Sequence, residues 1–535
     1  MIETEVVIAG GGPVGLVLAL ELGARGVRCV VLNESPTTAQ HPKANAISSR
    51  TMEHLRRHRL AERLRPRGLD DDHPTDLCYV TSLTGFEIGR FRQASRREAL
   101  AQARDGTGPW ASPEPPHRCS QIFLEEELRR GAEAFASVET RFGWRLTGFE
   151  DRGADVVCDV RNAETGETET VIGRYLVGCD GAASLVRKAL GIEYEGESGV
   201  VRPMMGGPMY AAYFRALDPP DWLPERRAWQ YWTISPELRA LLVHVDSDRH
   251  FVFHFALRPG EDGADPTTAI HQAVGREFPL EVISSVNWTA GYSLVAQKYR
   301  KGRVFLAGDA VHLFTPTGGM GMNTGVDDAV NLGWKLAAVL RDAGGETLLD
   351  SYEIERRPIG LRNVGLARGF ADSVGTVEIS PAIADDTPEG AAERARLKPR
   401  FEHHAEFEFI IPGAFLGLRY DGSPVIAYDG SEPPPDHPNE YVPNAVPGAR
   451  APHVWLGDDA LYDRLGRDFT LLRFAGATGT LGPDVATLDI DDPAARDLYG
   501  ADYVLVRPDQ HVAWRGSEIA DAGALLDIVH GRAAL

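Results

Sequence analysis

The start of the chain carries a glycine pattern, Gly10-x-Gly12-x-x-Gly15, that strongly limits how these residues can fold. An apolar, β-rich run at residues 5–9 leads into the glycines, and an apolar helical pattern at residues 14–25 follows them. In this setting the first glycine permits a tight turn, the second lets the backbone approach a pyrophosphate, and the third allows close packing of helix on strand. The pattern therefore predicts a βαβ unit that holds a dinucleotide at a helix N-terminus.

The second strand of this unit, residues 28–32, ends where such folds usually hold an acidic residue for a ribose. Here the strand runs into Asn33, with Glu34 beside it. An asparagine can still accept a hydrogen bond from a ribose hydroxyl, so both residues are candidates for this contact. Pro13 and Val14, at the start of the helix, are expected to contact the same ligand.

Three later segments extend the pattern. Residues 178–187 contain Asp180-Gly181, residues 303–309 end in Gly308-Asp309, and residues 316–323 read Pro-Thr-Gly-Gly-Met-Gly-Met-Asn. A carboxylate such as Asp309 can accept hydrogen bonds from the hydroxyls of a sugar-like chain. The glycines of the last segment let backbone N–H groups approach a ligand closely, and the N-terminus of a helix predicted at residues 325–340 would stabilise negative charge there.

Together these motifs resemble those of the class A, single-component FAD-dependent aromatic hydroxylases, the family of para-hydroxybenzoate hydroxylase and phenol hydroxylase. The resemblance covers residues 3–370 and implies FAD as the cofactor. In this family the Asp-Gly motif serves both FAD and the reduced nicotinamide cofactor, and the later aspartate binds the ribityl chain. The residues thereby expected to contact FAD are Gly10, Gly12, Pro13, Val14, Gly15, Asn33, Glu34, Asp180, Gly181, Gly308, Asp309, Pro316, Gly319, Gly321, Met322 and Asn323.

The resemblance extends to four further positions. Lys43 occupies a place where relatives hold a basic residue near FAD, and Gln121 matches a flavin-contacting glutamine. Leu146 matches a backbone contact to adenine. Asn45 stands where some phenol-type relatives hold a histidine close to the substrate, and an asparagine cannot act as the base. Pro316 matches a proline near the reacting edge of the flavin, so it and Asn45 are candidates for the catalytic region.

The chain is long enough for several domains, since 535 residues exceed one ordinary core. We expect an α/β protein with a Rossmann-like (GR2-type) FAD-binding domain at residues 1–200 and 290–375. A mostly antiparallel β-sheet domain for the substrate is expected at residues 201–289. A helical and linker region at 376–447 then leads to a C-terminal α/β domain at 448–535, which resembles a thioredoxin-like domain. Within these domains, residues 65–116 are expected to be irregular and residues 381–399 to form a loop with short helices.

The reaction implied by the resemblance is hydroxylation of a phenolic ring with NAD(P)H and O2, through a flavin C4a-hydroperoxide. No second Gly-x-Gly-x-x-Gly follows a strand, so NADH or NADPH is expected to bind only transiently as reductant. A second hypothesis keeps the fold but acts on a polyketide quinone or an antibiotic, by hydroxylation or Baeyer–Villiger-type insertion. A third is a flavin-binding protein without turnover.

Aromatic residues at 228–234 resemble the strand that lines the ring pocket in this family. Trp232 is the preferred pocket residue, and strict alternation predicts that Trp229 and Tyr231 share the opposite face. His244 and His254, on later strands, are candidates to orient or deprotonate a hydroxyl. No dense arginine cluster marks a carboxylate pocket, which favours a neutral phenol, although Arg215 or Arg249 could serve an acid.

Composition excludes several other classes of partner and site. The formal net charge of −21 disfavours binding to nucleic acid or to an anionic membrane. The five cysteines show no metal-type spacing, and no metal site or disulfide scaffold is expected. No signal-peptide pattern is present at the N-terminus, so we expect a cytoplasmic protein. The C-terminal domain has no cysteine, which favours packing or support of a homodimer over redox work.

Overall fold

The βαβ unit predicted from the glycine pattern lies at the centre of a six-stranded sheet. The computed structural model describes residues 2–200, 207–257, 265–375 and 377–533. Five neighbouring strands of the sheet run parallel, and a short antiparallel strand closes one edge. In spatial order the strands are β20 (Arg300–Lys301), β21 (Val304–Leu306), β12 (Tyr175–Gly178), β2 (Val6–Ala9), β3 (Cys29–Asn33) and β8 (Val138–Phe142).

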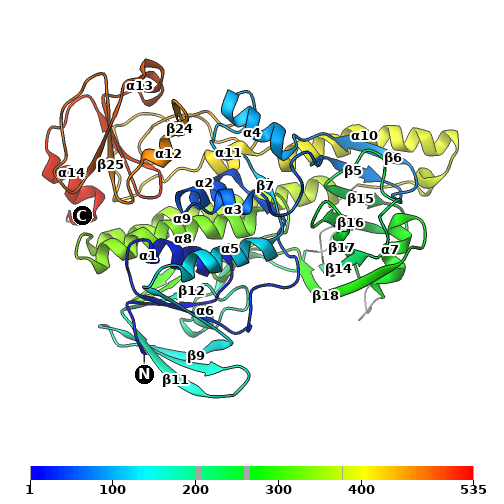
Figure 1. The fold of residues 1–535 in the computed structure, drawn as a ribbon, viewed down its shortest axis with the longest axis horizontal. Helices are drawn as coiled ribbons and strands as arrows, with labels where there is room; N and C mark the ends of the chain where they lie inside the picture. The colour runs from blue at the N-terminus through cyan, green and yellow to red at the C-terminus, as the bar shows by residue number, and fades with distance from the viewer. Residues whose placement is uncertain (1, 201–206, 258–264, 376, 534–535) are drawn as a thin grey trace.

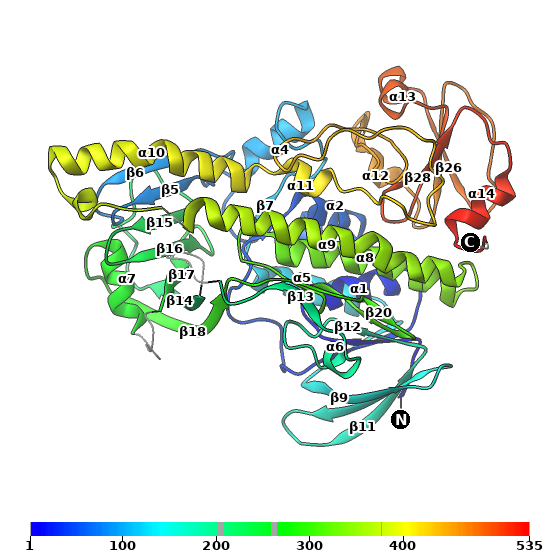
Figure 2. The same ribbon diagram turned by 180° about the vertical axis from the view of Figure 1, so that it is seen from behind.

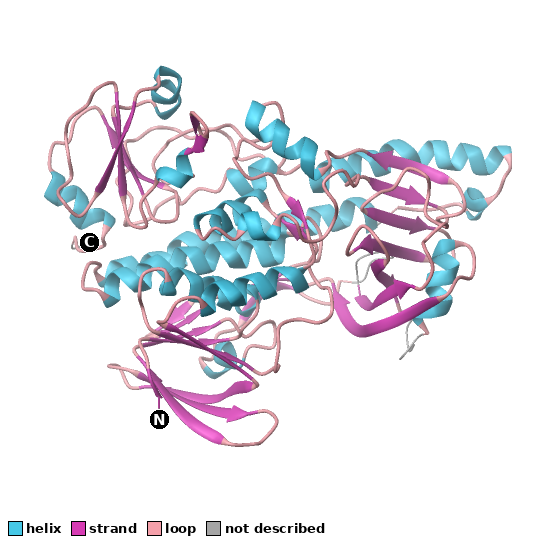
Figure 3. Cartoon of the chain, viewed as in Figure 1, coloured by secondary structure: helices cyan, strands magenta, loops and turns pink. Residues whose placement is uncertain are grey.

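A layer of helices covers one face of this parallel sheet (Figure 3). Helix α1 is buried along almost its whole length, because the sheet lies beneath it and two other helices flank it. The layer consists of α1 (Pro13–Gly23), α5 (Gln121–Glu133), α8 (Met320–Leu340) and the long α9 (Glu346–Gly375). Below the parallel sheet lies a four-stranded sheet of β1 (Ile2–Glu3), β11 (Thr168–Gly173), β10 (Val156–Asn162) and β9 (Trp144–Asp151) (Figure 1).

A separate seven-stranded sheet stands beside the helices. Its strand order is β18 (Leu280–Ala290), β14 (Gly207–Ala216), β17 (His250–Ala256), β16 (Arg239–His244), β15 (Gln230–Ile234), β5 (Leu77–Val80) and β6 (Glu87–Phe91). All neighbours are antiparallel except β15 and β5, which pair in parallel. The sheet therefore recruits two strands from residues 65–116. The prediction that those residues are irregular is wrong, because β5 and β6 pair with each other across a short turn. The pairing of β5 with β15, about 150 residues later, leaves no local signal.

Helix α10 (Pro388–Phe409) lies along one face of the seven-stranded sheet (Figure 2), and α7 (Pro266–Val274) covers the other. Leu397, Phe401 and Ala405 of α10, spaced four residues apart, pack against the sheet. The prediction that residues 381–399 form a loop with short helices is wrong over most of that range. Charged residues dominate the rest of the helix, so its helical form depends on the sheet beneath it.

The C-terminal region forms a smaller mixed sheet of β26 (Ala486–Ile490), β25 (Thr470–Phe474), β27 (Tyr503–Val506) and β28 (Val512–Gly516). Helices α13 (Pro493–Tyr499) and α14 (Ala522–Val529) accompany it. The thioredoxin-like character of this region stays a prediction. None of the described helices carries an apolar stretch long enough to span a bilayer. The described residues also contain no group of three or more His, Cys, Asp or Glu side chains arranged for a metal ion.

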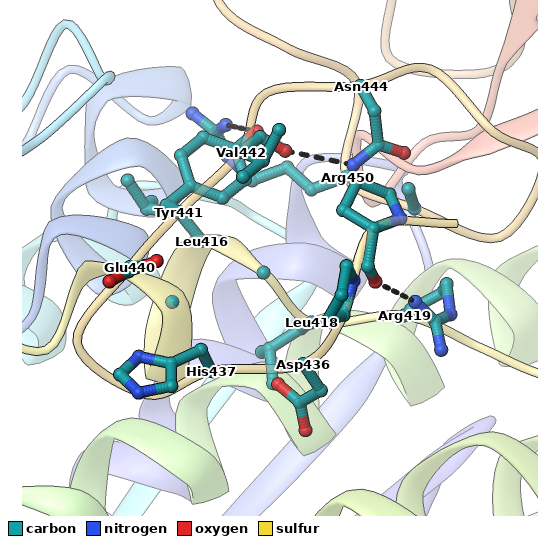
Figure 4. Close-up of a pocket in the computed structure, with 15 residues that line it drawn as sticks. Leu416, Leu418, Arg419, Asp436, His437, Glu440, Tyr441, Val442, Asn444 and Arg450 are labelled. Atoms are coloured by element: carbon teal, nitrogen blue, oxygen red, sulfur yellow. Dashed lines mark hydrogen bonds between the residues drawn. The ribbon is translucent and has the colours of Figure 1, made fainter.

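Residues 434–450 form an extended segment that wraps around α11 (Pro412–Leu416) and leads into the C-terminal region. Figure 4 shows the pocket between this segment and α11. A side chain at Gly413 would come within 2.2 Å of two carbonyl oxygens of this segment, so only glycine allows the close approach. Arg419 donates to the Pro434 carbonyl, and Arg450 to the Tyr441 hydroxyl. These contacts leave a space of only about 30 Å³ between helix and segment.

The remaining elements are short. They are β4 (Ala46–Ile47), β7 (His117–Arg118), β13 (Tyr194–Glu197), β19 (Ser293–Ala296), β22 (His312–Leu313), β23 (Trp455–Leu456), β24 (Asp459–Ala460), α2 (Ser49–Arg57), α3 (Ala61–Leu64), α4 (Arg96–Asp105), α6 (Leu185–Ala189), α12 (Leu461–Arg464), η1 (Gly308–Ala310) and η2 (Pro381–Ala384).

Candidate active site

A cavity of about 830 Å³ extends from the glycine loop after β2 to the seven-stranded sheet. One end lies at the carboxyl edge of the parallel strands, where open α/β sheets bind their ligands. The other end lies against the face of the second sheet that α10 covers. A single space thus joins the predicted FAD motifs to the predicted aromatic pocket.

The glycine loop has the shape that a pyrophosphate requires. Gly10 has a φ of +112°, and a side chain there would meet the Cys179 carbonyl oxygen at 2.1 Å. A side chain at Gly15 would meet the Gly10 carbonyl oxygen at 1.9 Å. Gly12, by contrast, faces open space in the cavity, next to Pro13 and Val14. Gly10 and Gly15 therefore shape the turn, and Gly12 presents its backbone to the cavity.

The two candidates for the ribose contact behave differently. Asn33 lines the cavity, accepts a hydrogen bond from the Gly11 N–H at 3.1 Å, and donates to the Ser35 carbonyl at 3.1 Å. A carboxylate could accept but could not donate, so the amide ties the glycine loop after β2 to the chain that follows β3. Glu34 does not line the cavity, and its carboxylate is paired with Arg145 at 3.2 Å.

The Asp-Gly and Gly-Asp motifs each place one residue at the cavity. Gly181 (φ +77°) and Asp309 line it. The Asp180 carboxylate instead accepts from the Ser184 hydroxyl at 2.5 Å and the Val186 N–H at 3.1 Å, so it supports the start of α6. A side chain at Gly308 would meet Val14 at 2.9 Å, so this glycine lets the motif pack against α1.

The segment 316–323 forms the wall between the two ends of the cavity. Pro316, Gly319, Gly321 and Met322 line the cavity. Gly319 adopts φ +62° immediately before α8, which begins at Met320 and not at residue 325 as predicted. The Asn323 amide accepts from Ser48 and Thr51 and donates to the Ala46 and Gly319 carbonyls, so it fixes the loop from behind.

Three of the four positions taken from the wider resemblance reach the cavity. Lys43, Asn45 and Gln121 line it, and the Gln121 side chain also accepts from the Ala44 N–H at 3.3 Å. Leu146 does not line the cavity; it lies on β9 and packs against the core of the parallel sheet.

The aromatic wall differs from the alternation predicted for residues 229–232. Trp229 and Trp232 both line the cavity, whereas Tyr231 packs into the opposite face of the sheet. The prediction that Trp229 and Tyr231 share a face is wrong, because β15 begins only at Gln230 and Trp229 lies outside the regular alternation. Trp288, from the far edge of the sheet, and Phe409, from α10, add to the aromatic lining, as do Tyr292 and Phe314.

Only one of the two candidate histidines is at the cavity. His254 lines it, and its Nδ1 is buried without a hydrogen-bond partner. Burial lowers the pKa of His254 to about 4, so the ring is neutral near pH 7 and able to accept a hydrogen bond. His244 lies on the opposite face of the sheet, stacked edge-on against His73, and burial lowers its pKa to about 3. His244 therefore lies outside the site and does not contact the substrate.

Three polar residues that sequence reasoning missed also line the cavity: His41, Trp288 and Glu408. Each has a buried polar atom without a hydrogen-bond partner, namely His41 Nε2, Trp288 Nε1 and Glu408 Oε2. Strand alternation over residues 280–290 could have indicated Trp288. No local signal marked Glu408, because its place depends on how α10 packs.

Glu408 connects the aromatic end of the cavity to the flavin-motif loop. Its Oε1 accepts from the Gly318 N–H at 2.9 Å, and its Oε2 lies 3.0 Å from Nε2 of His404 in a geometry that is not a hydrogen bond. Ser373 donates to the Phe370 carbonyl at 2.7 Å, which leaves its oxygen to accept from Nδ1 of His404 at 2.6 Å. Nδ1 of His404 therefore carries the hydrogen in the neutral ring, and Nε2, the nitrogen close to the carboxylate, carries none.

Comparison with known proteins identifies the family. Residues 3–367 match the family described as FAD binding domain, and residues 444–533 match the family described as aromatic-ring hydroxylase, C-terminal. The chain belongs to the FAD-dependent aromatic-ring hydroxylases. Phenol 2-monooxygenase of a Pseudomonas species is 31% identical to this hydroxylase, over 99% of this chain and 93% of the relative.

Solved structures share the fold over the whole length. RebC with bound 7-carboxy-K252c is 35% identical, with a TM-score of 0.88 over 99% of this hydroxylase and 100% of that chain. Aklavinone-11 hydroxylase in a ternary complex with FAD and aklavinone is 28% identical, with a TM-score of 0.80 over 99% and 100% of the two chains. The predicted family and the α/β monooxygenase fold are thereby confirmed.

The residues at the glycine end of the cavity fit FAD. Gly12 offers open backbone at the N-terminus of α1, where a pyrophosphate is stabilised. Asp309 supplies a carboxylate for hydroxyl groups, and Gly319 and Gly321 bring backbone to the cavity at the N-terminus of α8.

Proposed function

We propose that this hydroxylase oxidises a neutral phenolic ring, with NAD(P)H as the electron donor and O2 as the oxidant. The observation that carries the proposal is the lining of the aromatic end of the cavity. Trp229, Trp232 and Phe409 offer flat apolar surface, and no arginine lines the cavity among the described residues. The unpartnered atoms of His41, His254 and Glu408 supply hydrogen-bonding groups that suit hydroxyl or carbonyl substituents.

The FAD-contacting roles of the motif residues belong to this proposal. Gly12, Pro13, Val14 and Asn33 would hold the pyrophosphate and the adenosine half, and Asp309 the ribityl chain. Gly319, Gly321 and Met322 would contact the ring, which, when bound, supplies electron transfer from NAD(P)H and the activation of O2. Five further motif residues have an indirect role, because they shape or support the loops that line the cavity. They are Gly10, Gly15, Asp180, Gly308 and Asn323.

The chain's own residues then handle the phenolic proton. We assign Glu408 as the group that accepts it, because a carboxylate with a free oxygen at the cavity is a suitable general base. His404 stands behind Glu408 and can receive the proton in turn. His254, neutral near pH 7, would orient the substrate by accepting a hydrogen bond. The aromatic walls and the buried face of α10 exclude water from the reacting ring.

A second substrate class is favoured by the ligands of related solved structures. The cavity of about 830 Å³ has to hold FAD as well as the substrate, so its volume does not choose between the two classes. RebC was solved with 7-carboxy-K252c, and aklavinone-11 hydroxylase with aklavinone. A polyketide quinone or an antibiotic precursor is therefore the alternative substrate, by hydroxylation or Baeyer–Villiger-type insertion.

Anaerobic stopped-flow absorbance tests the proposal. The holoenzyme is mixed with NADH or NADPH, alone and with simple phenols, naphthols, polycyclic polyketide phenols and aromatic acids. We expect flavin bleaching to accelerate with a neutral phenol, and the size of the best ligand to decide between the two substrate classes. Acceleration by aromatic acids alone would contradict a neutral substrate. No acceleration by any compound, with flavin bound, would favour a protein without turnover.

A further inference from the structure

A second cavity, of about 220 Å³, lies beside the N-terminus of α4, outside the site described above. Helix α4 is on the outside of the molecule, between α10 and the C-terminal region, in both Figure 1 and Figure 2. The residues that matter for its chemistry are Arg92, Gln93, Arg96, Trp110, Pro116 and Arg118. We call this cavity the donor pocket, because its lining is rich in N–H groups.

Two buried N–H groups of the donor pocket have no acceptor. Nη1 of Arg96 and Nε2 of Gln93 are both buried without a hydrogen-bond partner. Gln93 is only 9% exposed. Buried donors are almost always satisfied in folded proteins, because leaving them unpaired is costly. Two orphaned donors around one space indicate a missing acceptor.

A third donor, Arg118, carries a charge that no carboxylate offsets. Its guanidinium donates to Oε1 of Gln93 at 2.8 Å and lies 4.2 Å from the centre of the Trp229 ring. No ion pair of Arg118 occurs within the described part of the chain, and burial lowers its pKa to about 10. The other arginines differ, because Asp71 pairs with Arg96 and Glu98 pairs with Arg92.

The donor pocket lies one layer of side chains away from the reaction cavity. A narrow space of about 20 Å³ shares Trp110, Pro116 and Arg118 with the donor pocket. The same narrow space shares Glu408 and Phe409 with the reaction cavity. Arg118, stacked on Trp229, is thus a direct contact between the two sites.

We propose that the donor pocket binds one small oxyanion, a carboxylate or a phosphate group, held by Gln93, Arg96 and Arg118. The volume suits such a group and is too small for a whole dinucleotide or polycyclic molecule. A single anion would satisfy both orphaned donors and the uncompensated charge. The exposed Asp70 also lines the pocket and limits the site to a ligand of low charge. In a chain of net charge −21, only a local cluster of donors can attract an anion.

Calorimetric titration of the FAD-loaded holoenzyme at constant ionic strength tests the site, with inorganic phosphate and benzoate as separate probes. The holoenzyme is used so that phosphate cannot enter the FAD pyrophosphate site. The informative variant is Gln93→Glu, which keeps the shape but replaces the orphaned donor with a carboxylate beside Arg118. We expect saturable binding by the wild type and a loss of affinity of about tenfold or more in the variant.

Two further variants make the result interpretable. Gln297→Glu makes the same change of charge at an exposed position and should leave anion affinity unchanged. Arg96→Lys keeps the charge but removes the planar donor set, and should weaken binding even if Gln93→Glu fails to fold. Absence of saturable binding of either probe to the wild type would overturn the proposal. So would equal affinities in wild type, Gln93→Glu and Arg96→Lys.

The source of the anion is decided by flavin reduction kinetics with the same variants. A higher KM for NADPH in Gln93→Glu, with the KM for NADH unchanged, would assign the site to the extra phosphate of NADPH. Unchanged KM values for both, with loss of benzoate binding, would assign it to a carboxylate-bearing ligand. In either case we expect anion binding to quench the fluorescence of Trp229, because Trp229 contacts Arg118. We expect no such quenching in Gln93→Glu.

Discussion

At the scale of single residues, the replacement of one carboxylate oxygen of Glu408 should have the largest effect on hydroxylation. Glu408→Gln keeps an oxygen for the Gly318 N–H but removes the negative charge that accepts a proton. We expect unchanged FAD content and flavin reduction, with hydroxylation slower by about 100-fold, the usual lower range for loss of a general base. Single-turnover hydroxylation, measured across pH, checks this. The control is Glu406→Gln, an exposed glutamate on the same helix; equal rates in the two variants would contradict the assignment.

At the scale of elements, the C-terminus of α10 determines where Glu408 and Phe409 lie. Asn439, in the segment that wraps α11, donates to the Phe407 carbonyl at 2.9 Å and the Ile410 carbonyl at 2.8 Å. Asn439→Ala would leave these carbonyls unpaired, at a cost of about 2 kcal/mol for two hydrogen bonds. We expect the end of α10 to exchange its amide hydrogens faster and substrate to bind more weakly.

Hydrogen exchange resolved by peptide, together with substrate titration, tests the role of this cap. Asn444→Ala is the matched control, because the Asn444 amide donates only to the nearby Val442 carbonyl. If both variants exchange and bind like the wild type, the cap does not hold the cavity wall.

At the scale of the whole molecule, buried ion pairs join the C-terminal region to the helices of the FAD-binding part. Glu53 of α2 is paired with Arg450 and, at 2.8 Å, with Arg50, whose guanidinium also donates to Gln510 at 2.6 Å. Burial alone would raise the pKa of Glu53, but the charges of Arg450 and Arg50 outweigh it and hold the pKa at about 2. The ordinary value is 4.5.

This depressed pKa makes the junction sensitive to acid. A group whose pKa is lower in the folded state stabilises above its unfolded pKa, so stability should fall as pH drops from 4.5 toward 2. The difference between the two pKa values corresponds to roughly 3 kcal/mol.

We expect the midpoint temperature of the first unfolding transition to fall between pH 4.5 and pH 2. Glu53→Gln should lower this midpoint at neutral pH and flatten its dependence on pH. Glu150→Gln, in an exposed ion pair, should change neither. A pH profile of Glu53→Gln parallel to that of the wild type would contradict this account.

Local chemistry in the sequence determined the FAD-binding half of the protein. The positive φ of Gly10 and the contact of Gly15 with Gly10 are constraints within a few residues, and the strand and helix patterns on either side are equally local. The glycine loop and the parallel sheet could therefore be predicted from local patterns. The cavity-lining positions of Lys43, Asn45, Gln121, Asp309 and Gly319 were predicted from the resemblance to the aromatic hydroxylases. Glu34, Asp180 and Leu146 show the limit of this reasoning, because a motif places the backbone but not the partner of each side chain.

Beyond Trp232 and His254, which the sequence indicated, tertiary structure decided the composition of the reacting end. The face on which Trp229 or Tyr231 lies depends on where β15 begins and on its pairing with β5, about 150 residues away in the chain. Glu408 reaches the cavity only because α10 packs on a sheet built from distant strands, and the donor pocket exists only where α4 meets β7. Such contacts leave no periodic trace in the sequence, since each joins segments that lie far apart along the chain.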